Sequence, residues 1–77
     1  MINNFTDDEH QQISTFHSEL ERRVKERSEF AHVTGGLVDG PVQEYLFQIW
    51  EGNSLDCEFR VYKDGYTRAV TYVRVYR

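Results

Sequence analysis

The C-terminal run of residues 57–77 most constrains the fold, because polar and apolar side chains alternate along two segments joined by a turn. Lys63-Asp64-Gly65 supplies the turn residues between a segment at about 55–62 and another at about 66–76. Alternation with a period of two is typical of strands that place one face on a core. This run therefore predicts an antiparallel β-hairpin.

Loop length decides which side chains share a face of that hairpin. A two-residue loop would place Val61 opposite Arg68, whereas a three-residue loop with Gly65 in the left-handed region pairs Phe59 with Ala69. We predict the three-residue loop, because it gathers the aliphatic residues on one face: Leu55, Cys57, Phe59, Val61, Ala69, Val73 and Val75. The other face is then predicted to hold Asp56, Glu58, Arg60, Tyr62, Tyr66, Arg68, Val70, Tyr72, Arg74 and Tyr76.

A helix is indicated near the N-terminus. Thr6 and Glu9 have the spacing of a capping box, in which each side chain accepts a hydrogen bond from the other residue's backbone N–H. Apolar residues then recur at three- and four-residue steps: Ile13, Phe16, Leu20 and Val24. The pattern predicts an amphipathic helix over about 7–27.

The middle of the chain predicts two more strands, at about 30–34 and 42–50, separated by glycines and by the Asp39-Gly40-Pro41 turn. The strand at 42–50 is apolar at both parities, and the sequence leaves open which parity faces the helix. Residues 1–77 are therefore predicted to form a single small domain of the α+β class. One N-terminal helix packs on a four-stranded antiparallel meander, in the order α-β-β-β-β.

The outward face of the hairpin is the largest candidate binding surface, because Tyr, Trp and Arg dominate interface hot spots and a lone helix covers only one face of a sheet. The candidate partner-binding residues are Trp50, Arg60, Tyr62, Tyr66, Arg68, Tyr72, Arg74 and Tyr76. Three partners fit such a face: another protein, a second copy closing sheet to sheet, or a single-stranded nucleic acid stacked on the rings.

Charge disfavours the nucleic acid. Residues 1–58 carry twelve acidic and four basic side chains, whereas residues 59–77 carry one acidic and five basic ones. The formal net charge is −4, while general nucleic-acid binders are usually strongly basic. A local basic face remains compatible with these totals.

No catalytic, cofactor or metal site is predicted. His10 and His17 lie seven residues apart on the predicted helix, whereas helical metal ligands normally lie three or four apart. Cys57 falls on the predicted inner face, where a thiol behaves as a small inert hydrophobe. The chain is therefore predicted not to be an enzyme.

The remaining expectations concern location and role. A single cysteine rules out an intrachain disulfide, and no signal peptide or membrane-spanning run is recognised, which predicts a cytoplasmic protein. The functional prediction is a small protein-binding module, an inhibitor or accessory factor of the kind that phages and mobile elements encode. The alternatives are a homodimeric accessory protein and a single-stranded nucleic-acid binder.

Overall fold

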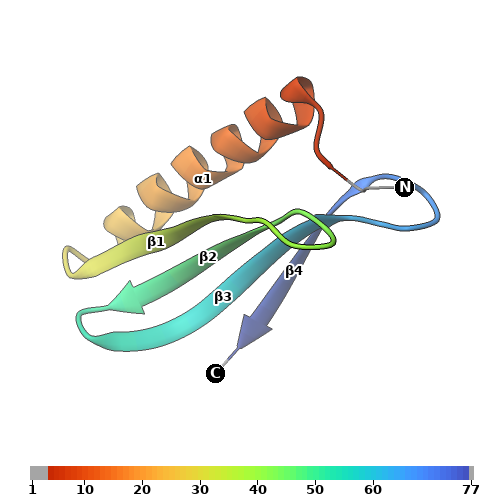
Figure 1. The fold of residues 1–77 in the computed structure, drawn as a ribbon. Helices are drawn as coiled ribbons and strands as arrows, with labels where there is room; N and C mark the ends of the chain where they lie inside the picture. Colours follow the sequence, from red (N-terminus) through yellow and green to blue (C-terminus); the bar gives the residue numbers. More distant parts are fainter. Residues whose placement is uncertain (1–3, 77) are drawn as a thin grey trace.

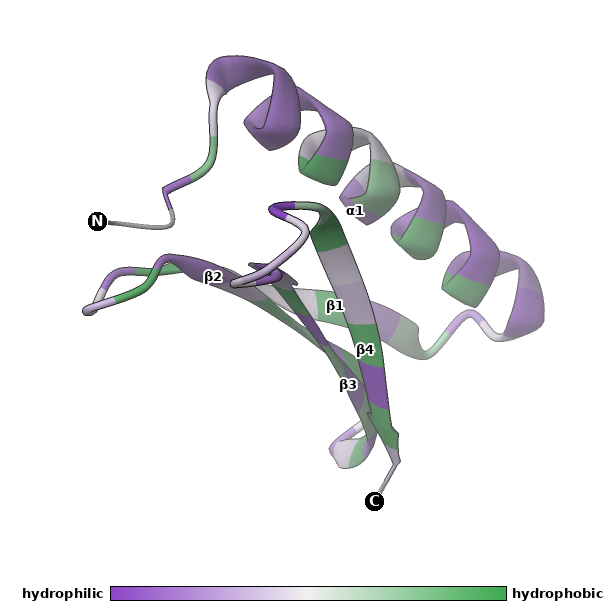
Figure 2. Ribbon diagram, turned by 90° about the vertical axis from the view of Figure 1, so that its right-hand side faces the viewer, coloured by the Kyte–Doolittle hydropathy of each residue, from purple (hydrophilic) through white to green (hydrophobic). Residues whose placement is uncertain are grey.

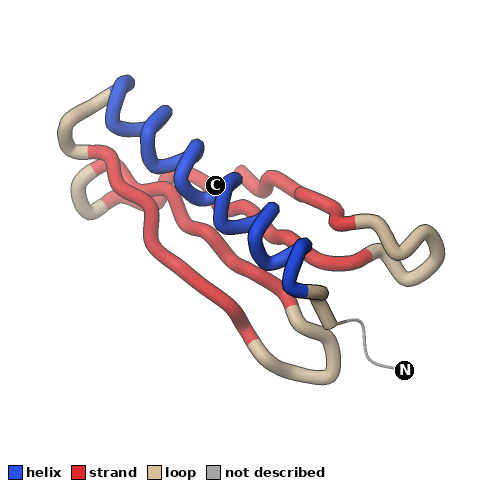
Figure 3. Tube along the Cα trace, turned by 90° about the horizontal axis from the view of Figure 1, so that it is seen from above, coloured by secondary structure: helices blue, strands red, loops and turns tan. Residues whose placement is uncertain are grey.

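The computed structural model describes residues 4–76, which form one helix and one four-stranded sheet (Figure 1). The elements are α1 (Asp7–Arg27), β1 (Ala31–Val38), β2 (Glu44–Glu51), β3 (Ser54–Lys63) and β4 (Val70–Tyr76). The strands are antiparallel in the order β1-β2-β3-β4, and α1 lies along one face of the sheet (Figure 3). The predicted α+β class and α-β-β-β-β order are confirmed.

Helix α1 begins and packs as its sequence indicates. The Thr6 Oγ1 accepts a hydrogen bond from the Glu9 N–H at 3.2 Å, and the Glu9 Oε1 accepts one from the Thr6 N–H at 2.8 Å. Ile13 and Val24 are buried. The apolar side of α1 faces the sheet (Figure 2). This local pattern is sufficient to fix the helix and its buried side.

An ion pair ties the start of α1 to the end of β3. Lys63 Nζ lies 2.9 Å from Glu9 Oε1, although the Lys63 residue is only 9 % exposed. The Thr6 backbone hydrogen bond, followed by the Lys63 contact, lowers the pKa of Glu9. The paired Lys63 therefore fixes the start of the helix over the sheet.

The inner face of β2 carries Tyr45, Phe47 and Ile49, which resolves the parity that the sequence left open. Phe47 and Ile49 pack with Val61 and Cys57 of β3 in the buried core. Leu46 and Trp50 consequently lie on the opposite face of the sheet.

Strand β1 extends through both glycines to Val38, beyond the predicted end at residue 34. Its inner face carries Ala31, Val33, Gly35 and Leu37, and β1 is the strand that α1 approaches most closely. Larger side chains on β3 and β4, such as Phe59 and Tyr72, hold the helix farther from that half of the sheet.

A β-bulge changes the start of β3. Ile49 pairs with Cys57, but the next residue, Trp50, pairs with Leu55, which leaves Asp56 as the extra residue. Asp56 Oδ2 lies 3.2 Å from Arg27 Nη2 at the end of α1. The predictions that Leu55 points inward and Asp56 outward were therefore wrong.

The predicted register of the last hairpin was also wrong. Phe59 pairs with Arg74 instead of Ala69, a shift of five residues, and an odd shift exchanges the two faces of β4. The loop spans residues 64–69, so β4 begins at Val70 rather than at residue 66. Tyr72, Arg74 and Tyr76 face the helix side, whereas Thr71, Val73 and Val75 face away.

Within the part of the chain that the structure describes, α1 lacks the length of apolar sequence that a membrane crossing requires.

Candidate functional site

The eight predicted partner-binding residues do not form one surface. Trp50, Arg60 and Tyr62 lie on the face turned away from α1, which we call the open face. Tyr66 and Arg68 lie in the β3–β4 loop. The three residues from β4, Tyr72, Arg74 and Tyr76, lie on the helix side. Arg60 of β3 pairs with Val73, so Arg60 and Arg68 of the loop do not lie beside each other across the hairpin.

A groove runs along α1 where the helix stands away from β3 and β4. Its larger part has a volume of about 520 Å³, and an adjoining part of about 280 Å³ continues toward the end of the helix. Both parts are lined by Leu20, Arg23 and Phe59. The remaining lining residues are Gln12, Thr15, Phe16, Glu19, Val24, Arg27, Ile49 and Arg74.

Aromatic contacts shape the floor and one end of the groove. The ring of Phe16 lies 5.4 Å from that of Phe59 and 4.7 Å from that of Tyr72, measured between centroids. Gln12 Nε2 donates a hydrogen bond to the Tyr72 hydroxyl at 3.2 Å. Tyr72 therefore contacts two lining residues, Gln12 and Phe16, at the end of the groove near the start of α1.

Three arginines border the groove, and their charges are balanced to different degrees. Arg27 is paired with Asp56, and Arg23 lies 3.8 Å from Glu19. Arg74 has no ion pair with any residue in the range 4–76. Its guanidinium instead lies 5.6 Å from the Phe59 ring centroid and 4.4 Å from that of Tyr76.

Sequence reasoning missed most of this groove. The apolar pattern assigned Phe16, Leu20 and Phe59 to the core, and it assigned no binding role to Arg23 or Arg27. The available signal was their spacing, because Arg23 and Arg27 lie four residues apart beside the apolar stripe. That spacing places both arginines on one flank of α1.

The groove borders a free sheet edge. Strand β4 pairs with β3 on one side, and no other strand among residues 4–76 pairs with its outer side. The sequence from Val70 to Tyr76 contains no proline, and its pairing with β3 has no register shift. An edge of this kind offers unpaired backbone N–H and C=O groups to an incoming strand.

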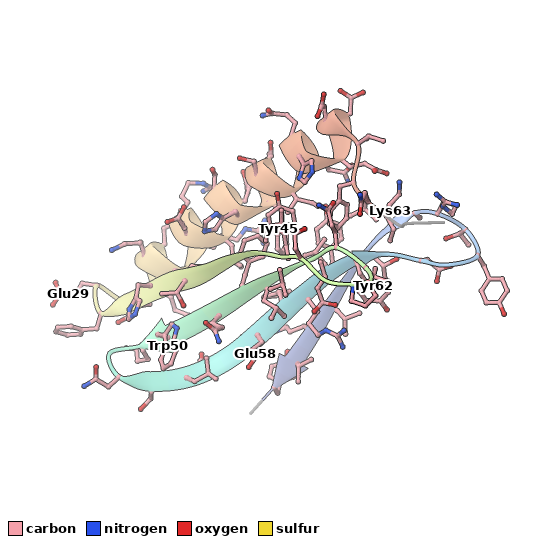
Figure 4. The ribbon with its side chains drawn as sticks, in the orientation of Figure 1. Glu29, Tyr45, Trp50, Glu58, Tyr62 and Lys63 are labelled. Carbon is pink, nitrogen blue, oxygen red and sulfur yellow. The ribbon has the colours of Figure 1, made fainter. Side chains whose placement is uncertain are left out.

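The open face is more polar and more internally bonded than predicted. Trp50 Nε1 donates to Thr34 Oγ1 at 2.8 Å, and the Trp50 ring stacks on His32 at 6.2 Å. Arg60 Nη2 lies 3.1 Å from Glu44 Oε2, and this hydrogen bond raises the pKa of Arg60. In Figure 4, Glu58 and Tyr62 lie below the sheet, while Tyr45 and Lys63 lie on the helix side.

The β3–β4 loop is held by its first residue. The Asp64 carboxylate accepts hydrogen bonds from the backbone N–H groups of Tyr66 at 2.8 Å and Thr67 at 2.9 Å. These bonds, with that of Thr67 the larger contribution, lower the pKa of Asp64. Arg68 adopts a left-handed backbone, φ 63°, and Tyr66 is 98 % exposed at the tip.

The histidines and the cysteine have structural surroundings. His10 Nδ1 lies 2.7 Å from the Tyr45 hydroxyl, and His17 stacks on Phe47 at 4.7 Å between ring centroids. Cys57 is 2 % exposed. Among the described residues, no three His, Cys, Asp or Glu side chains come together as metal ligands would.

Comparison with known protein families, with curated proteins and with solved structures found no match for this chain.

Proposed function

We propose that this protein is a non-enzymatic module that binds a segment of another protein in the groove between α1 and β3–β4. The observation that carries the proposal is the direct adjacency of an apolar floor, an Arg74 without an ion pair to any of residues 4–76, and a strand edge that no strand in that range covers. Grooves that combine apolar pockets with an accessible backbone are typical of peptide recognition. The class we favour is an inhibitor or accessory factor of the phage or mobile-element type.

A protein partner suits these surfaces better than a single-stranded nucleic acid. Stacking of successive bases requires rings and cations on one continuous platform. Here Arg60 and Tyr62 lie on the face opposite to Tyr72 and Arg74. An enzymatic role finds no support either, because burial of Cys57 favours an inert thiol.

Site-specific photo-crosslinking tests this proposal in the cell that produces the protein. A photoreactive phenylalanine analogue is placed at Arg23 or Tyr76, beside the groove, and at Lys25 or Thr34 as controls. Lys25 lies on the other flank of α1, and Thr34 lies on the open face. We expect adducts with the same protein from positions 23 and 76, and none from positions 25 and 34.

Other adduct patterns contradict the proposal. If adducts form from Lys25 alone, or from none of the four positions, the groove is not the binding site. Adducts from Thr34 alone whose mass equals two chains instead favour the homodimer.

The open face is the surface on which a homodimer would close. Leu46, Val73 and Val75 provide apolar area there, but the Glu44–Arg60 ion pair lies among them. Stacking two such faces would remove these charges from water, which is costly. We therefore rank the homodimer second, and the mass of the protein in solution tests it.

A further inference from the structure

We infer that the segment bound in the groove is an extended, acidic one that pairs with β4 as a fifth strand. The inference rests on the proposed function and specifies the partner at the same site. Three observations carry it: the direction of the free backbone groups of β4, the lack of an ion pair between Arg74 and any of residues 4–76, and the poor self-complementarity of this edge.

The hydrogen-bond pattern identifies which β4 residues offer their backbone to a partner. The Asp64 N–H donates to the Ala69 carbonyl at 2.9 Å, just beyond the last ladder pair, Lys63 and Val70, which marks that pair as a non-hydrogen-bonded one. Bonded and non-bonded pairs alternate along an antiparallel ladder, and no register shift interrupts it from Lys63 to Cys57. Thr71 and Val73 therefore bond to β3, whereas Tyr72 and Arg74 direct their N–H and C=O groups to the free edge.

The same two residues have their side chains on the helix side. An added strand would place alternate side chains on that side, next to Tyr72 and Arg74 and over the margin of the groove. An acidic side chain opposite Arg74 would supply the ion pair that residues 4–76 do not provide. An apolar side chain two positions away would lie beside Tyr72, which packs on Phe16.

A second copy of the chain fits this edge less well. Antiparallel pairing of β4 with itself about a two-fold axis keeps both helix sides on one face of the joined sheet. Both copies of Arg74 would then lie on that face without an acidic partner. Like charges close together on a sheet face are destabilising, so a different, acidic strand is the better occupant.

Nothing in the sequence of β4 blocks such pairing. Natural edge strands are commonly protected by proline, bulges or short length. Strand β4 has seven residues, continuous register and no proline. The edge is therefore available to a peptide backbone.

A library of displayed eight-residue peptides, selected on the purified full chain, tests the inference. We expect the enriched peptides to alternate in polarity and to carry Asp or Glu at one of the alternate positions. The dissociation constant of an enriched peptide should rise about tenfold for Arg74→Glu and should stay unchanged for Lys25→Glu. Lys25 is an exposed helix residue outside the groove. Lys25→Glu therefore makes the same change in charge as Arg74→Glu but away from the proposed site.

Amide hydrogen exchange separates strand addition from other binding modes. On addition of an enriched peptide, we expect exchange at Tyr72 and Arg74 to slow by at least tenfold, because their N–H groups gain partners. The Thr71 and Val73 amides already bond to β3 and serve as internal controls. Unchanged exchange at 72 and 74 overturns the inference.

The inference and the proposed function fail separately. Three results would overturn the inference of an acidic strand. The enriched peptides could lack an acidic preference, they could bind Arg74→Glu as tightly as the wild type, or no peptide could be enriched at all. Crosslinks from Arg23 and Tyr76 would in those cases still support binding in the groove. Absence of those crosslinks overturns the proposed function itself.

Discussion

Gly35 is the residue at which the backbone of β1 leaves no room for a side chain. Its φ is +126°, and a Cβ built there would lie 1.9 Å from the carbonyl oxygen of Leu46 on β2. We expect Gly35→Ala to lower the free energy of unfolding by about 2–4 kcal/mol, because backbone strain and a clash with rigid backbone combine. Urea denaturation measures the change.

The neighbouring glycine provides the control for this substitution. A Cβ at Gly36 meets no atom within 4 Å, and its φ is not positive. Gly36→Ala should change the free energy of unfolding by no more than about 0.5 kcal/mol. Equal losses for the two variants would show that strand glycines matter here for reasons other than the approach of Leu46.

His17 presents a buried nitrogen that has no hydrogen-bond partner among residues 4–76. Its Nε2 is buried and has no hydrogen bond, and the nearest carboxylate oxygen, on Glu21, lies 3.8 Å away. We expect His17→Phe to raise the free energy of unfolding by about 1 kcal/mol, because the ring stack on Phe47 is kept and the unpaired nitrogen is removed. His32→Phe, at an exposed ring, should change little, and a destabilised His17→Phe would contradict the argument.

At the level of elements, the β3–β4 loop depends on the ionised Asp64. Backbone N–H groups of Thr67 and Tyr66 hold its pKa below the ordinary value, so the carboxylate stabilises the folded state above the unfolded pKa of about 4. This contribution is lost as the pH falls through the lower, folded pKa. In urea denaturation, the stability difference between wild type and Asp64→Asn should therefore be constant above about pH 5 and shrink on acidification below about pH 4.

Glu9 does not confound this comparison. Its pKa is lowered as well, but its surroundings are the same in the wild type and in Asp64→Asn, so its contribution cancels in the difference. A difference that stays constant down to pH 2 would mean that the Asp64 carboxylate does not hold the loop.

Elements determined by local pattern were predictable, and the last hairpin was not. The helix follows from the Thr6–Glu9 capping box and its apolar stripe, both of which lie within a few turns of chain. The faces of β4 depend instead on a six-residue loop bonded by Asp64 and on the packing of Tyr72 against Phe16. Neither feature can be predicted from the alternation of β4. That alternation is equally compatible with the tyrosines and Arg74 facing the helix or facing away from it.

The same reasoning explains which part of the candidate site was predictable. Alternation placed Tyr72, Arg74 and Tyr76 on a common face, and the structure keeps them together. It could not place them beside α1, nor join them to Arg23 and Arg27, which are about fifty residues away in sequence. The groove lies where α1, which packs closest to β1, stands away from β3 and β4.

At the scale of the whole molecule, one helix leaves two surfaces of different character. The groove combines apolar floor and arginines on the helix side, although the chain carries a net charge of −4. The open face combines aliphatic residues with the Glu44–Arg60 pair and a bonded Trp50. The groove is therefore suited to an acidic partner, whereas the open face has most of its charge balanced internally.

This difference predicts that the purified chain is a monomer. A stable dimer needs about 1,200–2,000 Å² of buried surface, which the open face could supply only by burying Arg60 and Glu44 together with their copies. Light scattering at micromolar concentrations should give the mass of one chain, 9.2 kDa, for the wild type and for Val73→Glu alike. Val73 is chosen because it pairs with Arg60 on the open face and does not line the groove.

A wild-type mass of two chains that Val73→Glu restores to one would instead establish the open-face homodimer. The groove would remain accessible in that assembly, because α1 and the open face lie on opposite sides of the sheet (Figure 1). Peptide binding by the Val73→Glu monomer and by the wild-type dimer should then be equal for each chain. The solution mass thus determines the oligomeric state, while peptide binding by Arg74→Glu tests the acidic partner. Neither measurement depends on the other.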